Sequence, residues 1–582
     1  MEFSRKETNF FSIYKNLKYL YFSLEKRSRI KIWITALLVL ISALLESLVV
    51  ASIIPFIKVL TEDEQFIGNL FNKLPLLDIN LFRSNVIIIA IVLFWTFVLS
   101  SSYVRLFNLR FSSFVVAEMG RDLSRKCFLS ILNRPYLKIL ESKSGDVLNV
   151  LIRNIDWTVA CLNYLFDVIV ASSTILVISL VLIFVSPKEY IFFLIVISVT
   201  YFIINKKNKN KFLYSGRVSV ENSKLQTGVM KEALDSYKYL FISNNQKIFQ
   251  EKYSKADKNL RINKANIRVM SQSPKYYLEA TMIIALTLVA ILNNSEDSIL
   301  KIGLLLVAFQ KLLPSSQIVY RNLNLIKSNF KSFEEIKFTL QNVQKKRKIL
   351  PKNKDFFREK ISLKNIEFVY PSKPNLKVLS NLNLDIKKGD IIGLMGPSGS
   401  GKSTVIDILL GLIKPNSGEI LVDNKNLFEN FPENIYQWHE LISYVPQNVV
   451  LIDATIAENI AFNYENIDFD FIDKILKVVE LDSFVNKLPN KANQLVGDSG
   501  ISLSGGQKQR IGIARSLYRN GEILILDEAT SSLNVEIEKK IITNINDSFK
   551  GKTQLIVTHK FSTLDYCDQI YRIENKTLKI NG

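Results

Sequence analysis

The stretch Gly396-Pro397-Ser398-Gly399-Ser400-Gly401-Lys402-Ser403-Thr404 decides how the rest of the chain is interpreted. It follows an apolar run at residues 391–395, which predicts a buried strand, and it precedes residues 405–410, which predict a helix. Glycines in this setting let the backbone wrap around phosphate groups, with several N–H groups pointing inward. Lys402 would reach the outer phosphates and Ser403 would bind Mg²⁺. The stretch therefore predicts a nucleotide site in an α/β domain.

Two further strand ends carry groups that a nucleotide site needs. The apolar run 523–526 ends in Asp527 and Glu528, where the first carboxylate can hold Mg²⁺ and the second can polarise an attacking water. His559 follows the apolar run 554–558 and is one of two histidines in the chain. We therefore expect His559 at the γ-phosphate.

The first part of the chain has the composition of a membrane domain. Six apolar runs predict transmembrane helices, at residues 30–60, 86–104, 159–185, 190–204, 278–292 and 299–313. Residues 105–153 contain nine Lys and Arg against four acids, and residues 206–275 contain sixteen against five. The excess of basic residues predicts that both connections and both termini are cytoplasmic. Since these connections are rich in helix formers, we expect helices that continue past the bilayer.

The net charge of +21 is confined to this first part. Residues 1–354 carry 49 basic and 25 acidic side chains, whereas residues 355–582 carry 26 and 29. Positive charge between apolar spans is typical of the cytoplasmic loops of a membrane protein, so no nucleic-acid partner is expected. Three cysteines lie far apart and predict neither a disulfide framework nor a zinc site.

We therefore expect a membrane domain at residues 1–340, a charged linker at 341–359 and a nucleotide-binding domain at 360–582. One connection between spans has a pattern of its own. Apolar residues recur there at helical spacing, at Phe66, Ile67, Leu70, Phe71 and Leu74. An amphipathic helix on the outer membrane surface and a plain surface loop fit this pattern equally well.

A second motif carries a family resemblance. Leu503-Ser504-Gly505-Gly506-Gln507 lies between the two phosphate motifs and resembles the signature of ATP-binding-cassette (ABC) proteins. The whole chain then resembles a half-size ABC exporter: an α-helical polytopic membrane domain with six transmembrane helices of the exporter type, followed by an α/β P-loop NTPase cassette. This resemblance implies ATP and Mg²⁺ as cofactors and ATP hydrolysis coupled to translocation.

The resemblance also assigns the residues of the site. Glu528 matches the catalytic base, His559 the switch histidine, and Gln447 the glutamine that meets Mg²⁺ and the attacking water. Ser403, Gln447 and Asp527 are the expected Mg²⁺ ligands, and Tyr370 matches the aromatic residue that stacks on adenine. The other expected ATP contacts are Gly396, Ser398, Gly399, Ser400, Gly401, Lys402, Ser403, Thr404, Ser504, Gly505, Gly506 and Gln507.

Two positions depart from the family pattern. Asp498 stands where exporters usually have Glu, in a segment (residues 496–500) that resembles the one touching the coupling helices. Asn534 stands where a family motif ends in Asp, so a charge is lost while a hydrogen-bonding side chain is kept. The coupling segments themselves are expected near residues 134–145 and 237–246.

The signature motif implies a dimer. In ABC proteins it completes the ATP site of the opposite subunit, so a chain with one cassette needs a partner. A second copy of the same chain is the simplest partner, and we expect a homodimer.

Charged residues inside the predicted spans are the best indication of the substrate, because they are costly unless they face a cavity or a partner. Those within the spans or at their ends are Glu46, Asp156, Asp167, Lys275, Glu279, Lys301 and Lys311.

The segments around Lys275 and Lys311 resemble the bacterial lipid-linked oligosaccharide flippases, in which basic residues at these positions handle a lipid pyrophosphate. A third basic position of that family falls near Ser101. The resemblance implies a polyprenyl-pyrophosphate-linked saccharide as the substrate, bound by Lys275 and Lys311, and a bacterial cytoplasmic (inner) membrane location.

Other interpretations stay open. The two lysines could instead extend toward the membrane surface from the ends of their spans. The cargo could be another lipid, a peptide, a toxin or a drug. Besides a flippase and an exporter of another cargo, a third possible function is a regulatory membrane protein that binds ATP and does not pump. Intact Glu528 and His559 argue against this third function.

Overall fold

The computed structural model describes residues 15, 18–19, 21–60, 86–185, 187–292, 297–341, 351, 353–463, 465–497 and 501–580. The chain divides into two compact units. The first comprises Met1–Arg134 and Ser142–Gln344, and the second comprises Pro135–Glu141 and Lys345–Gly582. The predicted amphipathic segment at residues 61–84, most of the linker, and Asp498 lie outside the described residues.

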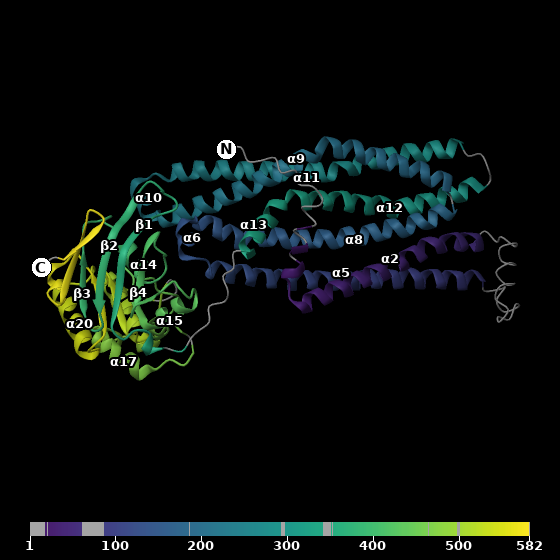
Figure 1. The fold of residues 1–582 in the computed structure, drawn as a ribbon. Coiled ribbons are helices and arrows are strands. Elements are labelled where there is room, and N and C mark those ends of the chain that lie inside the picture. The colour runs from purple at the N-terminus through teal and green to yellow at the C-terminus, as the bar shows by residue number, and fades with distance from the viewer. Residues whose placement is uncertain are drawn as a thin grey trace. The chain divides into compact units, whose positions relative to one another are not determined.

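Long helices form the first unit (Figure 1). Within the described residues six of them have 31 to 49 residues, namely α2 (Lys26–Leu60), α5 (Val86–Leu132), α8 (Ile155–Val185), α9 (Pro187–Asp235), α11 (Gln246–Leu292) and α12 (Asp297–Ser328). The shorter elements are α7 (Ser144–Asn149), the π-helix at Val150–Asn154, α10 (Tyr237–Ser243) and α13 (Phe330–Gln341). Each predicted span lies on one of the six long helices, in the same order.

Four helical stretches in the described residues are long and apolar enough to cross a membrane, at Lys26–Glu46, Ala90–Leu132, Gly145–Phe184 and Pro187–Asn208. The fifth and sixth predicted spans lie on α11 and α12, which are not among these four. At about 1.5 Å per residue, the 49 residues of α9 extend about 70 Å, more than twice the roughly 30 Å of a bilayer's hydrocarbon core. The long helices therefore continue well beyond the membrane, as the helix-forming connections predicted.

The long helices of the first unit pack in pairs. Helix α2 lies against α5, α8 against α12, and α9 against α11. A buried cluster joins α8, α9, α11 and α12, and includes Ile178, Leu182, Phe193, Met282, Leu305 and Phe309. Large apolar side chains such as Trp33 and Phe184 stay exposed, which suits a surface in contact with lipid chains.

Two sheets form the framework of the second unit (Figure 1). The larger has the strand order β12-β11-β3-β10-β9-β6, with β3 (Ile391–Met395), β6 (Ile442–Val445), β9 (Ile523–Asp527), β10 (Thr553–Val557), β11 (Gln569–Glu574) and β12 (Thr577–Ile580). The smaller is antiparallel, in the order β2-β1-β4-β5, with β1 (Lys360–Val369), β2 (Lys377–Lys387), β4 (Ser417–Val422) and β5 (Lys425–Asn426). A short pair is formed by β7 (Ala454–Thr455) and β8 (Leu495–Val496).

Helices α14 (Lys402–Leu409), α20 (Val535–Ser548) and α21 (Phe561–Leu564) follow β3, β9 and β10 of the larger sheet. The other helices described after β1 are α15 (Glu433–Leu441), α16 (Ile456–Ala461), α17 (Phe469–Val478), α18 (Asp482–Val485) and α19 (Gly505–Arg519). The second unit also includes α6 (Tyr136–Glu141), whose Tyr136 and Leu137 pack against its core. This short helix falls within the coupling segment expected near residues 134–145.

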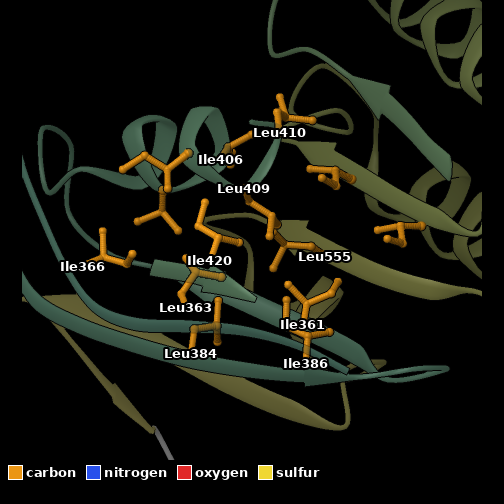
Figure 2. Packing of buried hydrophobic residues seen from close by; sticks show 14 of the residues in the cluster. Ile361, Leu363, Ile366, Leu384, Ile386, Ile406, Leu409, Leu410, Ile420 and Leu555 are labelled. Atoms are coloured by element: carbon orange, nitrogen blue, oxygen red, sulfur yellow. The ribbon is translucent and has the colours of Figure 1, made fainter. Parts of the chain in front are cut away.

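Helix α14 lies at the centre of the second unit's core (Figure 2). Its Ile406 and Leu409 belong to one buried cluster with Leu363 of the antiparallel sheet and Leu555 of the larger sheet. Every residue of β9 and β10 is buried, as expected for central parallel strands covered on both faces. Because α14 follows the phosphate-binding loop directly, this packing fixes the loop on a rigid support.

Candidate nucleotide site and membrane cavity

Four neighbouring parallel strands end at one edge of the larger sheet, which we call the site edge. In β3, β10, β9 and β6 the paired residues near this edge are Leu394 with Val557, Val557 with Asp527, and Leu526 with Val445. The residues that follow these strands therefore meet, although they are far apart in the sequence. They are the phosphate loop (residues 396–404), His559, Glu528 and Gln447.

The phosphate loop has the backbone that its glycines allow. Gly399 and Gly401 have positive φ angles of +77° and +105°, a region that favours glycine. A Cβ atom at Gly401 would also lie 2.9 Å from Leu379 Cδ2. The buried hydroxyl of Ser400 has no hydrogen-bond partner among the described residues, so this loop presents a donor that a phosphate oxygen would satisfy.

Lys402 is buried and bound to its own loop. Its Nζ atom donates to the carbonyl oxygens of Gly396, at 2.7 Å, and Pro397, at 3.2 Å. Burial lowers the pKa of Lys402, while the carboxylates of Glu528 and Asp527 oppose the shift. A partly desolvated ammonium group whose partners among the described residues are carbonyl oxygens is well placed to bind phosphate oxygens.

The aromatic residue expected at adenine is tied to the phosphate loop. The hydroxyl of Tyr370 lies 3.1 Å from Oγ1 of Thr404, and its ring meets the Phe368 ring edge-on with centroids 4.9 Å apart. Ser398 and Ser403 are exposed at the loop. A ring fixed beside the phosphates in this way can stack on a base.

Glu528 lies at the centre of the site edge. Its Oε2 atom accepts a hydrogen bond from Gln447 Nε2 at 2.7 Å, and its Oε1 atom lies 3.1 Å from His559 Nε2. Its backbone N–H donates to the carbonyl of Val557, and its φ angle is +48°, which costs a non-glycine residue on the order of 1–3 kcal/mol. The structure thus brings the three expected catalytic residues into direct contact.

Asp527, the neighbour of Glu528, is buried and accepts a hydrogen bond from the Tyr444 hydroxyl at 3.3 Å. Burial raises the pKa of Asp527, and the charge of Glu528 adds to the shift. Burial and the nearby Asp527 together raise the pKa of Asp407, on α14, to about 6. A bound cation would relieve the repulsion between these carboxylates.

The expected Mg²⁺ ligands fit that ion. Ser403, Gln447 and Asp527 offer a hydroxyl, an amide oxygen and a carboxylate, all oxygen donors of the kind that Mg²⁺ prefers. Gln447 donates to Glu528 through its amide nitrogen, which leaves its carbonyl oxygen available for a cation. Mg²⁺ would take its other ligands from water and phosphate.

The signature motif begins helix α19. Ser504 is its N-cap: the hydroxyl accepts from the N–H of Gln507 at 3.2 Å, and the Gln507 side chain accepts from the N–H of Ser504 at 2.8 Å. Gln507 therefore has a capping function within its own chain. The Ser504 hydroxyl keeps its proton available for another acceptor.

The two expected substrate lysines lie in different surroundings. Lys311 is 3.5 Å from the buried carboxylate of Glu46, which also accepts hydrogen bonds from Arg105 and Thr174, each at 3.0 Å. We call these four residues the Glu46 cluster. Two cations share one carboxylate, so the cluster has a net positive charge. Arg105 lies one helical turn beyond Ser101, near which the resemblance places a third basic residue.

Lys275 lines a cavity of about 360 Å³ between α11 and α12, which we call the Lys275 cavity. Its Nζ atom is 3.7 Å from Glu279. Arg321 and Gln317 line the same cavity, and the buried amide nitrogen of Gln317 has no hydrogen-bond partner among the described residues. Lys311 is not part of the lining. Sequence reasoning did not predict Arg321, which follows the sixth predicted span by several residues and belongs to no motif.

Comparisons with known proteins agree with the cassette. Residues 379–531 match the family model described as ABC transporter. A putative export ATP-binding/permease protein of Rickettsia bellii is 39% identical over 222 residues, which are 38% of this chain and 38% of that protein. ATP-binding cassette sub-family B member 5 of mouse is 42% identical over 215 residues, 37% of this chain and 17% of the relative. The chain thus matches well under half the length of these relatives.

The fold is that of a helical membrane-type unit followed by an ABC-type cassette. The chain resembles the solved structure of a bacterial Atm1-family ABC exporter with ATP bound, with a TM-score of 0.77, 19% identity and coverage of 94% of each chain. The predicted fold class, a helical membrane-type unit followed by an α/β cassette, is therefore confirmed, while the number of six spans stays a prediction. At this identity, the likeness concerns the fold alone.

Proposed function

We propose that this chain is one half of an ATP-driven transporter that moves an amphipathic substrate across the cytoplasmic membrane. One observation carries the proposal. The phosphate loop, Asp527, Glu528 and His559 converge on one edge of a sheet, in a chain whose other unit consists of long apolar helices. An ATP-hydrolysing site joined to such helices supports coupled transport.

In the proposed reaction, Lys402 and the loop N–H groups hold the β- and γ-phosphates, and Tyr370 stacks on adenine. Mg²⁺, held by Ser403, Gln447 and Asp527, would neutralise developing charge on the phosphates. Glu528 orients the attacking water and accepts its proton, while His559 donates to the γ-phosphate. Catalysis of this kind rests on position and charge stabilisation.

A homodimer is part of the proposal. The Ser504 hydroxyl and the glycines beside it would complete the ATP site of the second copy. Helix α10, within the expected coupling segment at residues 237–246, exposes four large side chains: Tyr237, Tyr239, Phe241 and Ile242. Exposed apolar side chains gathered on seven residues are typical of a docking surface, and we assign this one to contact with the second copy.

For the substrate we propose a polyprenyl-pyrophosphate-linked saccharide, with both termini and the cassette on the cytoplasmic side of a bacterial inner membrane. The Lys275 cavity supports this choice, because Lys275, Arg321 and the unpartnered amide of Gln317 offer donors to phosphate oxygens. The net positive Glu46 cluster, which includes Lys311, supplies a second place for an anion.

The test uses the purified protein in proteoliposomes that contain a polyprenyl-pyrophosphate-linked saccharide. We expect ATP-dependent movement of the saccharide across the bilayer and stimulation of ATP hydrolysis by this lipid. Hydrolysis stimulated instead by another lipid, a peptide or a drug would favour the alternative cargo. A protein that binds ATP without hydrolysing it would contradict the proposal as a whole.

A further inference from the structure

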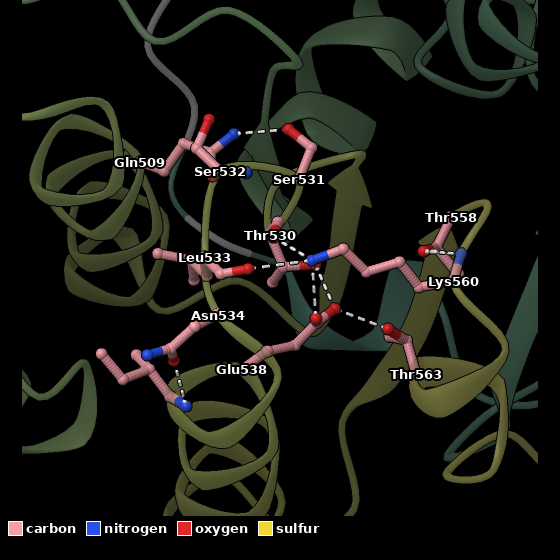
Figure 3. A network of polar contacts seen from close by, with 11 residues as sticks. Gln509, Thr530, Ser531, Ser532, Leu533, Asn534, Glu538, Thr558, Lys560 and Thr563 are labelled. Carbon is pink, nitrogen blue, oxygen red and sulfur yellow. Dashed lines mark hydrogen bonds and ion pairs between the residues drawn. The ribbon is translucent and has the colours of Figure 1, made fainter.

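A partly buried ion pair connects the loop after Glu528 with the segment after His559 (Figure 3). Glu538, on α20, is 1% exposed, and its Oε2 atom lies 2.9 Å from Nζ of Lys560. Its Oε1 atom accepts hydrogen bonds from the hydroxyls of Thr530, at 2.6 Å, and Thr563, at 2.5 Å. The carboxylate on α20 thus contacts two other segments, the loop at Thr530 and the segment at residues 560–563.

Lys560 uses its whole ammonium group in this network. Besides Glu538, its Nζ atom donates to the carbonyl oxygens of Thr530, at 2.9 Å, and Leu533, at 3.1 Å. Three acceptors match the three protons of the group. A polar network in which each member is satisfied is rigid, because a movement of Lys560 would leave the buried carboxylate of Glu538 without its cation.

The loop at residues 530–533 is also held from its other side. Gln509, on the helix that begins with the signature motif, donates to the Ser531 hydroxyl at 2.8 Å and accepts from the Ser532 N–H at 2.8 Å. Figure 3 shows Gln509 on one side of this loop and the Glu538–Lys560 pair on the other. The loop is therefore fixed between α19 and the segment that follows β10.

The position of this network relates it to the proposed reaction. Thr530 is two residues beyond Glu528, and Lys560 is the residue after His559. The bonds between Thr530, Lys560 and Glu538 therefore run beside the contact of 3.1 Å between His559 and Glu528. A shift of either strand end would have to break this second connection as well.

We propose that Glu538 and Lys560 are positioning residues for ATP hydrolysis: their ion pair fixes residues 530–533 against the segment that carries His559, and thereby sets the distance between His559 and Glu528. The inference rests on the proposed ATPase function. Neither residue contacts the reacting atoms, so each acts through the geometry of the other two. A misplacement of about 1 Å at such a site is enough to slow a reaction by about a hundredfold.

The test compares Glu538→Gln and Lys560→Met in the full-length protein in proteoliposomes. For each we expect kcat for ATP hydrolysis to fall about tenfold or more, with KM and the affinity for a fluorescent ATP analogue within about twofold of wild type. The kcat of the double variant should be no lower than that of the less active single variant, because the two side chains act as one unit. Lys560→Arg, which keeps the charge, should retain most of the activity.

Asp355→Asn provides the matched control, since Asp355 forms an exposed ion pair of 2.9 Å with Arg358 in the same unit; its kcat should not change. If Glu538→Gln fails to fold, Thr563→Val removes one donor to Glu538 without uncovering a charge, and kcat should fall about threefold. A purely structural function predicts a lower melting temperature with normal kcat for each folded molecule. That result, or multiplied losses in the double variant, would overturn the inference.

The proposed ATPase function can fail separately. If the wild-type protein does not hydrolyse ATP, that function is wrong, whatever the variants do. If it does hydrolyse ATP and the variants match its kcat, only the positioning function is wrong.

Discussion

The Nε2 atom of His559 lies 3.1 Å from Oε1 of Glu528, and this contact joins two adjacent parallel strands at their carboxyl ends. The second oxygen of Glu528 accepts a hydrogen bond from Gln447. A carboxylate held at both oxygens has little freedom to rotate. It therefore presents a fixed acceptor beside the phosphate loop, as a general base for an attacking water requires.

The first prediction concerns Glu528→Gln, which preserves the shape of the side chain and removes its ability to accept a proton. We expect ATP affinity within about threefold of wild type and a fall in kcat of about a hundredfold or more. The ATP-bound closed dimer should accumulate, because hydrolysis is what reopens it. Nucleotide binding, ATPase rate and dimer trapping on one preparation measure these effects. Glu419→Gln, at an exposed position of β4, is the control. Normal turnover by Glu528→Gln would show that another group is the base.

Asn534 carries the second prediction. Its side-chain oxygen accepts from the N–H of Ile537 at 2.8 Å and caps helix α20. Asn and Asp are about equally good at this position, whereas loss of a cap costs about 1 kcal/mol. We expect Asn534→Asp to leave the free energy of unfolding within about 0.5 kcal/mol of wild type, and Asn534→Ala to lower it by about 1 kcal/mol.

Unfolding of the full-length protein in detergent, followed by circular dichroism, compares these two variants. The replacement of Asp by Asn, which the sequence alone marked as a departure, then has no cost for the fold. If Asn534→Asp and Asn534→Ala lower the free energy of unfolding equally, Asn534 stabilises the fold by more than the helix cap.

The gathering of the candidate site's residues at one sheet edge could be predicted from the sequence because these residues follow buried strands. Runs such as residues 391–395 and 523–526 indicate strands by their apolar residues alone, and in a parallel sheet the residues after them must share one edge. The strands β3 (Ile391–Met395) and β9 (Ile523–Asp527) agree with those runs to within a residue. The helical membrane-type unit could also be predicted, because the length of its apolar runs and the distribution of its basic residues indicate it.

The contacts between distant residues could not be predicted in the same way. Glu538 and Lys560 belong to no motif, and their pairing depends on how α20 packs beside the segment after β10. In the first unit, the pairing of Lys311 with Glu46 and Arg105 depends on the rotation of three long helices. Arg321 reaches the Lys275 cavity for the same reason. The hydrophobic pattern does not determine such rotations for helices that are apolar over most of their surface.

The third prediction follows from the pKa of Asp407, which burial and the neighbouring Asp527 raise to about 6. Between about pH 4 and pH 6 the folded state binds more protons at this group than the unfolded state does, so stability falls as the pH rises through this window. Asp407→Asn removes the titration. We expect the free energy of unfolding of the variant to rise relative to that of wild type as the pH increases through this window. Above pH 6 the variant should stay more stable by on the order of 1 kcal/mol, since water screens part of the charge repulsion in wild type.

The measurement is the unfolding free energy of nucleotide-free protein at several pH values, with Asp565→Asn, which lies outside the site, as control. A pH-independent difference between Asp407→Asn and wild type would contradict the assignment.

The last prediction concerns the cargo. If Lys275 and Lys311 contact a pyrophosphate group, changing both to Gln removes charge-assisted hydrogen bonds that water cannot replace inside the membrane. Translocation of the lipid-linked saccharide should then be abolished. Basal ATP hydrolysis depends on residues of the cassette and should stay within about threefold, or roughly 0.7 kcal/mol. Arg105 continues to pair with Glu46 in this variant, so its buried carboxylate keeps one cation.

Arg321→Gln separates the two places that could bind the anion, because it changes the Lys275 cavity and leaves the Glu46 cluster intact. We expect it to impair translocation about as much as Lys275→Gln alone. Lys258→Gln, at an exposed position on α11, controls for the loss of one positive charge from the same helix. Translocation and ATPase rate are measured on the same proteoliposomes. If the two lysines only extend toward the membrane surface, the double variant should translocate normally. That outcome would favour an exporter of another cargo.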